Sequence, residues 1–255
     1  MISNSSTYST HSIRIGSETL ELLPEKAIWW MRKKTLVLSD IHLGKAGHFR
    51  KSGLAAPVQI NRNNLDRLDQ LLQRFHPTRL LLLGDLFHST RNREWLEFTT
   101  WRDQYPHLTL TLITGNHDLL PPQAYHEARI GTHPELYEGP FHFLHDAAEL
   151  PTTNSSANPS TNPSTNPSTN PHANPSTNPS TNPFTLSGHI HPGIRLRGKG
   201  RQSIRIPCFW HRPNGILLPA FGTFTGLHTI RPAPGDHVYA IADQSVLPIL
   251  PIQHS

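Results

Sequence analysis

Five short apolar runs of this sequence each end in side chains that can bind a metal ion. The candidates are two carboxylates, one amide and four histidines. The runs read LVLSDIH (36–42), LLLLGD (80–85), LTLITGNHD (110–118), FHFLH (141–145) and FTLSGHIH (184–191), and the candidate ligands are Asp40, His42, Asp85, Asn116, His145, His189 and His191. Seven oxygen and nitrogen ligands are too many for one tetrahedral ion and suit two ions that share a bridging carboxylate.

The spacing within the motifs predicts how the ligands converge. In Asp40-Ile41-His42, and again in His189-Ile190-His191, an extended backbone would point both ligands the same way. The two oxygens of Asp85 can bridge two metals ~3.5–4 Å apart. A single D-x-H or H-x-H is weak evidence, because a histidine taken alone is more often a surface or core residue. All five elements in this order, each after an apolar run, are strong evidence for a metal site.

The apolar runs themselves predict buried strands. Each is too short for a helix and rich in Leu, Val, Ile, Phe or Thr. Sites form where the carboxyl ends of strands converge in layered α/β proteins. Among the remaining segments, residues 12–31 predict two or three short strands, and residues 59–75 and 93–104 predict amphipathic helices. Trp95 and Trp101 are expected in the core rather than as base-stacking platforms.

The order D-x-H, G-D, G-N-H-D, H, G-H-x-H resembles the pattern of the calcineurin-like metallophosphoesterases. This resemblance implies an α+β fold, a four-layer α-β-β-α sandwich of two mixed β-sheets flanked by helices, with two metals at one edge. Three further stretches are similar to the ligase-associated DNA damage response endonucleases called PdeM. These stretches are SDIHLGKAGHFRKSGLAAP (39–57), IPCFWHRP (206–213) and LPAFGTFTG (218–226).

The resemblance implies a ligand set, a cofactor and a substrate. The first metal would be held by Asp40, His42, Asp85 and His191, and the second by Asp85, Asn116, His145 and His189. The implied cofactor is a pair of divalent ions, Mn²⁺ first, with Fe, Zn or Mg as alternatives. The implied substrate is single-stranded or damaged DNA, and a DNA ligase or helicase repair system is an implied partner.

Three residues near the ligands are candidates for a part in catalysis. His117, in G-N-H-D, would protonate the leaving group or stabilise the transition state. Asp118 would orient His117 or a neighbouring ligand, and His88 is the second candidate for His117's role. The run G-D-L-F-H (84–88) resembles that of metallophosphoesterase nucleases of double-strand break repair. Lys45, His48 and Arg50 are candidates for phosphate contact, although a structural role is equally open for each.

Charge is unevenly distributed along the chain. The formal net charge is +5, and residues 150–235 contain no Asp or Glu. Arg195, Arg197 and Lys199 follow His191 closely and would attract a phosphate backbone. An ordinary solvated edge strand would show the same charges. Beside a phosphoesterase site, the phosphate interpretation is favoured.

Composition predicts one domain, 1–255, because 255 residues suffice for one large core. No apolar run approaches the ~20 residues of a membrane span, and no secretory signal is recognisable. Cys208 is the only cysteine, so no internal disulfide is expected, and it should be a small buried hydrophobe. A cytoplasmic location and no membrane partner are therefore expected.

Residues 151–183 predict a low-complexity insertion within this domain. The sequence cycles through N-P-S-T, and proline at every fourth residue excludes helix and central strand. We expect a disordered loop, with a partner-binding or substrate-gating role as the alternative.

Three functions are compatible with these features. The first is a dimetal phosphodiesterase that acts as a DNA endonuclease in DNA repair. The second is a phosphodiesterase or phosphatase for a small nucleotide, with the same metals. The third is a metal-stabilised scaffold in a repair complex, which the intact ligand set disfavours.

Overall fold

The computed structural model describes residues 8–45, 60–147, 183–198 and 202–249. The predicted disordered insertion, except Pro183, lies outside these residues, as do His48, Arg50 and Lys199. The expectations for them therefore remain predictions.

The first sheet has seven strands in the order β1-β2-β3-β4-β5-β6-β7. Its strands are β1 (His11–Ile15), β2 (Glu18–Leu23), β3 (Ala27–Trp30), β4 (Thr35–Leu38), β5 (Arg79–Leu83), β6 (Thr109–Ile113) and β7 (Ile130–His133). The N-terminal strands β1 to β4 pair antiparallel, and β4 to β7 pair parallel. This mixed sheet includes the three short N-terminal strands and three of the five strands predicted before metal ligands.

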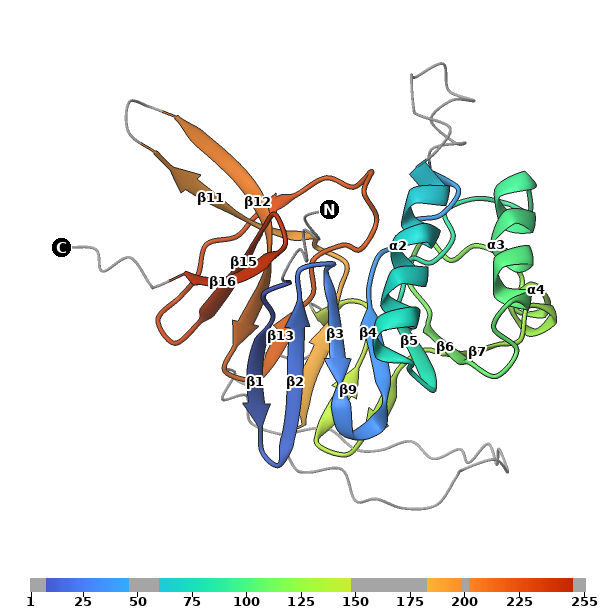
Figure 1. Cartoon of the computed structure of the whole chain (residues 1–255), viewed down its shortest axis with the longest axis horizontal. Helices are drawn as coiled ribbons and strands as arrows, with labels where there is room; N and C mark the ends of the chain where they lie inside the picture. Colours follow the sequence, from blue (N-terminus) through green and yellow to red (C-terminus); the bar gives the residue numbers. More distant parts are fainter. Residues whose placement is uncertain (1–7, 46–59, 148–182, 199–201, 250–255) are drawn as a thin grey trace, which may run out of the picture.

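The second sheet has nine strands. Seven of them follow the order β14-β11-β12-β13-β10-β9-β8, while β15 pairs with β12, and β16 pairs with β15. Its strands are β8 (Leu136–Glu138), β9 (Phe141–Phe143), β10 (Phe184–Ser187), β11 (Pro192–Arg197), β12 (Ser203–Arg212), β13 (Gly215–Leu217), β14 (His228–Thr229), β15 (His237–Ala242) and β16 (Ser245–Ile249). The pairs β9–β10 and β10–β13 are parallel, whereas β11–β12 is an antiparallel hairpin that extends away from the body in Figure 1.

Alternation along the central strands divides the core in two. Val37, Leu81, Leu83 and Ile113 face the second sheet, where they pack with residues such as Phe143. Their neighbours on the same strands, Leu36, Leu38, Leu80, Leu82, Leu110 and Leu112, belong to a cluster shared with the helices. Successive side chains of a strand point to opposite faces, so strands covered on both faces are apolar throughout.

The helices cover the first sheet, as Figure 1 shows for α2 (Ile60–Phe75), α3 (Arg93–Asp103) and α4 (Pro122–Glu127). Helix α2 packs through Leu65, Leu68, Leu71 and Leu72, whose spacing of three and four forms one apolar stripe. Asn92 caps α3 by accepting a hydrogen bond from the backbone N–H of Trp95 at 3.0 Å. A 3₁₀ turn, η1 (Met31–Lys33), joins β3 to β4.

Two mixed sheets with few helices confirm the expected fold class. Trp95 and Trp101 are buried against the first sheet, as predicted, and Cys208 is fully buried in the second. Burial raises the pKa of the Cys208 thiol to about 12. In the described part of the chain, no helix combines the length and apolar character that crossing a membrane requires.

Candidate metal centre

The structure brings all seven predicted ligands together at the carboxyl ends of five strands. Asp40 and His42 follow β4, Asp85 follows β5, and Asn116 follows β6. His145 follows β9, and His189 and His191 follow β10. Strands of both sheets are parallel here, so their carboxyl ends reach one edge of the sandwich.

One half of the site consists of Asp40, His42, His191 and Asp85. His42 Nε2 and His191 Nε2 lie 3.2 Å apart, and His191 Nε2 is 3.3 Å from Asp40 Oδ1. His42 Nε2 is also 3.7 Å from Asp85 Oδ2. Asp40, His42 and His191 can therefore direct their ligand atoms at a single ion.

The other half consists of Asp85, Asn116, His145 and His189. His145 Nε2 lies 3.1 Å from Asn116 Oδ1, 3.1 Å from His189 Nδ1 and 3.5 Å from Asp85 Oδ1. Asp85 thus presents one oxygen to each half. This is the geometry of a bridging carboxylate between two cations.

The buried carboxylate of Asp40 shows that these residues suit a cation. Asp40 is fully buried, and its Oδ1 has no hydrogen-bond partner among the described residues. A buried anionic oxygen without a donor is costly. His191 Nε2 and His42 Nε2 lie 3.3 and 3.9 Å from this oxygen, and neither makes a hydrogen bond of good geometry to it. A divalent cation between these atoms would satisfy all three.

The backbone differs from the extended form assumed for D-x-H and H-x-H. Asp40 and His42 have φ of 52°, and His189 and His191 have φ of 72° and 51°. The expectation that an extended strand aligns the paired ligands is therefore wrong. These residues instead lie in the left-handed region, which is uncommon outside glycine and clusters at functional sites. Asp85, also at φ 52°, follows the same pattern.

Two glycines of the motifs make room for the ligands. A Cβ at Gly84 would lie 2.0 Å from His145 Nδ1, and a Cβ at Gly188 would lie 2.4 Å from Asp40 Oδ2. Any side chain at either position would displace a ligand. This close approach explains why a glycine precedes Asp85 and His189 in the sequence.

The surroundings of three histidines determine which ring nitrogen faces the site or whether the ring is charged. His145 Nδ1 donates to the carbonyl oxygen of Leu83 at 3.0 Å, which leaves Nε2 unprotonated toward the site. His189 faces the site through Nδ1, and its Nε2 lies 3.6 Å from Asp146 Oδ2. Burial lowers the pKa of His42 to about 3, so this histidine is neutral, as metal ligation requires.

Asp118 organises the loop that carries Asp85. Its carboxylate accepts hydrogen bonds from the backbone N–H groups of Asp85, Leu86, Phe87 and Gly115, at 2.8 to 3.2 Å. Of the two roles predicted for Asp118, the structure supports orientation of a neighbouring ligand. No hydrogen bond between Asp118 and the His117 side chain is found among the described residues.

His117 and His88 lie together beside the first half of the site. Their rings stack with centroids 4.0 Å apart, and the His42 ring is 5.6 Å from His88 and 5.9 Å from His117. The backbone N–H of His117 donates to Asp85 Oδ1 at 3.0 Å. Both histidines can therefore reach a group bound at the centre.

The candidate phosphate contacts have different positions. Lys45 is half-buried, and its backbone N–H donates to the carbonyl of His42 at 3.3 Å. Burial lowers the pKa of Lys45, while Asp85 and Asp40 act to raise it, so its ammonium is electrostatically coupled to the site. Arg195 and Arg197 are exposed on β11, which begins directly after His191.

Two residues with a clear place in the site were not identified from sequence. Asp146 lies beside His189, although its position directly after His145 was a usable signal. Asn64 of α2 contacts the carbonyl of Ile41 through Nδ2 at 3.4 Å and the N–H of Thr223 through Oδ1 at 3.2 Å. Its position four residues after Ile60 and four before Leu68, on the apolar side of the predicted helix, was a usable signal for it.

Comparison with known proteins shows the family of this chain. Residues 33–166 match the calcineurin-like phosphoesterase family. The crystal structure of the Pseudomonas putida nuclease MPE superposes with a TM-score of 0.69 at 28% identity, covering 94% of this chain and 100% of that chain. The E. coli phosphoesterase Yfce superposes with a TM-score of 0.38 at 14% identity, covering 83% of this chain and 95% of that chain. This similarity is too distant to inform the site. No curated protein matches in sequence.

The fold, the buried Asp/His clusters and the family match define a class. This chain belongs to the calcineurin-like phosphoesterases and is a metal-dependent phosphoesterase. In sequence and structure it is similar to the Pseudomonas putida nuclease MPE.

Proposed function

We propose that this enzyme uses two divalent metals to hydrolyse phosphodiester bonds of DNA as an endonuclease in DNA damage repair. The observation that carries the chemistry is Asp85, which offers one oxygen to each of two ligand groups. Asp40, His42, Asp85 and His191 would hold one ion, and Asp85, Asn116, His145 and His189 the other. Mn²⁺ is the proposed metal, because the mixed carboxylate, amide and imidazole set contains no thiolate.

The chain's own residues divide the remaining work. The two cations, when bound, would neutralise the phosphate oxygens and lower the pKa of the attacking water. His117 would donate a proton to the leaving oxygen or stabilise its charge. His88 would hold the His117 ring in place by stacking on it. Asp118 would keep Asp85 in position by accepting a hydrogen bond from its backbone N–H group.

A nucleic-acid substrate is supported by the similar nuclease and by the basic face of the β11–β12 hairpin. Arg195 lies directly opposite Arg205 in the hairpin, and Arg197 lies opposite Ser203. Like charges placed directly opposite on one sheet face are unfavourable unless an anion lies between them. A phosphate backbone would supply that charge.

The other face of this hairpin is apolar. Ile194 pairs with Ile206 and Leu196 with Ile204. Ile194 packs at the hairpin base against Cys208, Ile230 and Val238. The arginines, on the opposite face, are exposed to solvent.

The role in repair is supported by the three sequence stretches similar to PdeM endonucleases.

The test is an assay of the purified protein with Mn²⁺ on circular single-stranded DNA, a cyclic nucleotide and an aryl phosphodiester. Conversion of the circle to linear strands is expected, because only internal cutting opens a circle. Hydrolysis of the two small substrates without cutting of DNA would instead identify a small-nucleotide phosphodiesterase. If none of the three substrates were hydrolysed, the proposed enzyme function would be refuted and the scaffold role would remain.

A further inference from the structure

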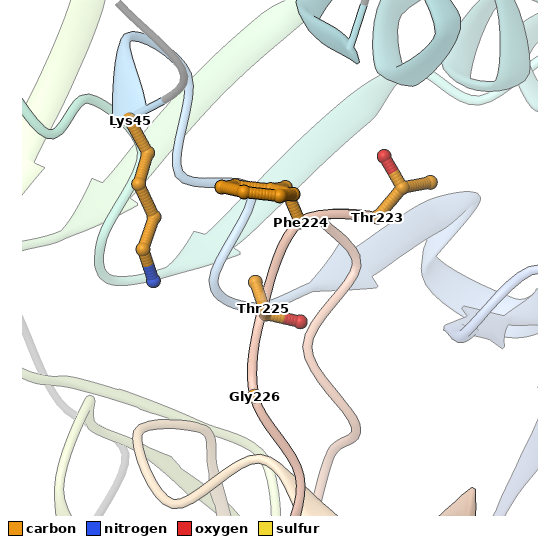
Figure 2. Close-up of a pocket in the computed structure, with 5 residues that line it drawn as sticks. All are labelled: Lys45, Thr223, Phe224, Thr225 and Gly226. Carbon is orange, nitrogen blue, oxygen red and sulfur yellow. The ribbon is translucent and has the colours of Figure 1, made fainter. Parts of the chain in front are cut away.

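A pocket lies beside the candidate metal centre and has no part in the chemistry described above. It has a volume of about 310 Å³ and is lined by Lys45, Thr223, Phe224, Thr225 and Gly226. Figure 2 shows the Phe224 ring edge-on, with the Lys45 ammonium and Thr225 on the same side of it. The volume is near the lower limit of pockets that bind small organic groups, roughly 300–1,000 Å³.

The segment that carries Phe224 is attached to the metal centre at both ends. At its start, the backbone N–H of Gly222 donates to the carbonyl of Asp40 at 3.0 Å. At its end, the N–H of His228 donates to the carbonyl of His191 at 3.0 Å. Phe224 therefore lies midway along a span between two candidate ligands of the same ion.

This segment is also held close to the protein. A Cβ at Gly222 would lie 2.5 Å from the carbonyl oxygen of Ile41, so the backbone approaches the ligand loop as closely as glycine allows. Thr225 Oγ1 donates to the carbonyl of Gly222 at 3.1 Å, which closes the turn around Phe224. The N–H of Thr223 is bound by Asn64 Oδ1. Phe224 is 37% exposed on this fixed turn, whereas Phe221 in the same segment is fully buried.

The pocket thus combines an accessible aromatic ring with a cation at a fixed place beside a phosphoesterase centre. Proteins that bind single-stranded nucleic acid use the same pair of groups, an aromatic ring that stacks on a base and a cation that contacts the backbone. A base can reach such a ring only when it is unstacked from its neighbours, which a single strand permits at low cost.

We propose that Phe224 and Lys45 form a subsite for one unpaired nucleotide next to the scissile phosphate, with the base stacked on Phe224 and a flanking phosphate contacted by Lys45. This inference rests on the proposed function, because it presupposes a nucleic-acid substrate. It adds where one nucleotide of the strand is held beside the metal centre, namely at Phe224 and Lys45 of this pocket.

The test uses oligothymidylate with one stable abasic nucleotide at its centre. On the wild-type enzyme, one phosphodiester next to the abasic nucleotide should be cut about 5- to 100-fold more slowly than the others, the share expected of one stacked base. In Phe224→Ala, all phosphodiesters should be cut at similar, lower rates. Phe224→Tyr, which keeps the flat ring, should restore the wild-type pattern, and Phe224→Leu, which keeps only the bulk, should not.

The outcomes separate this inference from the proposed function. Cutting with the same pattern in wild type and Phe224→Ala would overturn the subsite while leaving the nuclease intact. Hydrolysis of an aryl phosphodiester without any cutting of the strand would overturn the proposed function and the subsite with it. An unchanged melting temperature in each variant shows that the fold is preserved.

Lys45 is tested by salt dependence. Lys45→Met should raise KM for the strand and reduce the slope of log affinity against log salt by about 0.7, the value for one phosphate contact on a single strand. Lys45→Arg should keep the slope. An unchanged slope in Lys45→Met would remove Lys45 from the subsite.

Discussion

Asp85 is the side chain on which both halves of the candidate metal centre depend. Its Oδ2 lies 3.7 Å from His42 Nε2 and its Oδ1 lies 3.5 Å from His145 Nε2. The backbone N–H of Asp85 donates a hydrogen bond to the Asp118 carboxylate. Asp85 Oδ1 also accepts a hydrogen bond from the backbone N–H of His117. A change at Asp85 should therefore affect both ions and the position of His117.

Asp85→Asn should lose phosphodiesterase activity and bind less metal, because an amide supplies one neutral oxygen in place of a bridging anion. Metal per chain is measured by mass spectrometry after equilibration with Mn²⁺. Asp243→Asn, at an exposed position that also has positive φ, is the matched control and should retain wild-type metal content. Two bound ions and normal turnover in Asp85→Asn would refute the bridging role.

His117→Ala should lower turnover by ~10²–10⁴, the usual share of general acid–base catalysis, while metal content stays unchanged. If His117 donates a proton, the loss should be larger for a diester with a poor leaving group than for an aryl diester. His88→Ala should give a smaller loss of the same form, since the role proposed for His88 is to hold the His117 ring by stacking on it. Equal losses on both substrates would indicate that His117 only stabilises charge.

At the scale of the element, the β11–β12 hairpin is the surface that we propose for a polymeric substrate. Its basic face depends on cross-strand pairing, which places Arg195 beside Arg205 although they are distant in sequence. The sequence indicated Arg195 and Arg197 by their proximity to His191, but Arg205 could be assigned to the same face only from the register.

Replacing Arg195, Arg197 and Arg205 together with Gln should raise KM for DNA. It should also reduce the salt slope of DNA binding by roughly 0.7–0.9 for each phosphate contact removed. Hydrolysis of a small aryl phosphodiester should fall by less, because it has no distant phosphates. Arg14, Arg93 and Arg129, replaced in the same way, provide a charge-matched control on β1, α3 and the turn before β7. If the two triple variants bound DNA equally well, the hairpin would have no role in the interface.

Strand-forming runs were the part of the fold most accessible from sequence. All five strands before ligands follow from short apolar runs of strand-forming residues, and helices α2 and α3 follow from the spacing of their apolar residues. The order of strands in the second sheet did not follow, because it is set by pairing between distant segments. The left-handed backbone at Asp40 and His42 also did not follow, because the surrounding contacts impose it against the local preference of these residue types. Phe224 lacked any periodic signal.

At the scale of the whole molecule, the site joins two sheets that come from separate parts of the sequence. The strands β9 and β10 pair in parallel, with Phe141 opposite Phe184, although the predicted low-complexity insertion separates them in sequence. A parallel connection must return along the full length of the strand, and this normally takes a dozen residues or more.

Replacing residues 152–182 with a Gly-Ser linker of about 15 residues should leave metal content and activity unchanged. Halving the loop should alter the free energy of unfolding by only about 0.6 kcal/mol. The melting temperature should therefore shift by about 2 °C at most. A linker of about four residues is the contrasting variant and should destabilise the β9–β10 pair. A large fall in melting temperature with the longer linker would show that the repeat is structural.

The central claim is that two metal ions, held between the carboxyl ends of strands from both sheets, enable this chain to cut DNA. Its most direct test is to titrate metal-free protein with Mn²⁺ while measuring the rate of cutting of circular single-stranded DNA. The account predicts no cutting without metal and a rate that reaches its plateau at about two equivalents per chain. A plateau at one equivalent, or cutting that survives complete removal of metal, would contradict it.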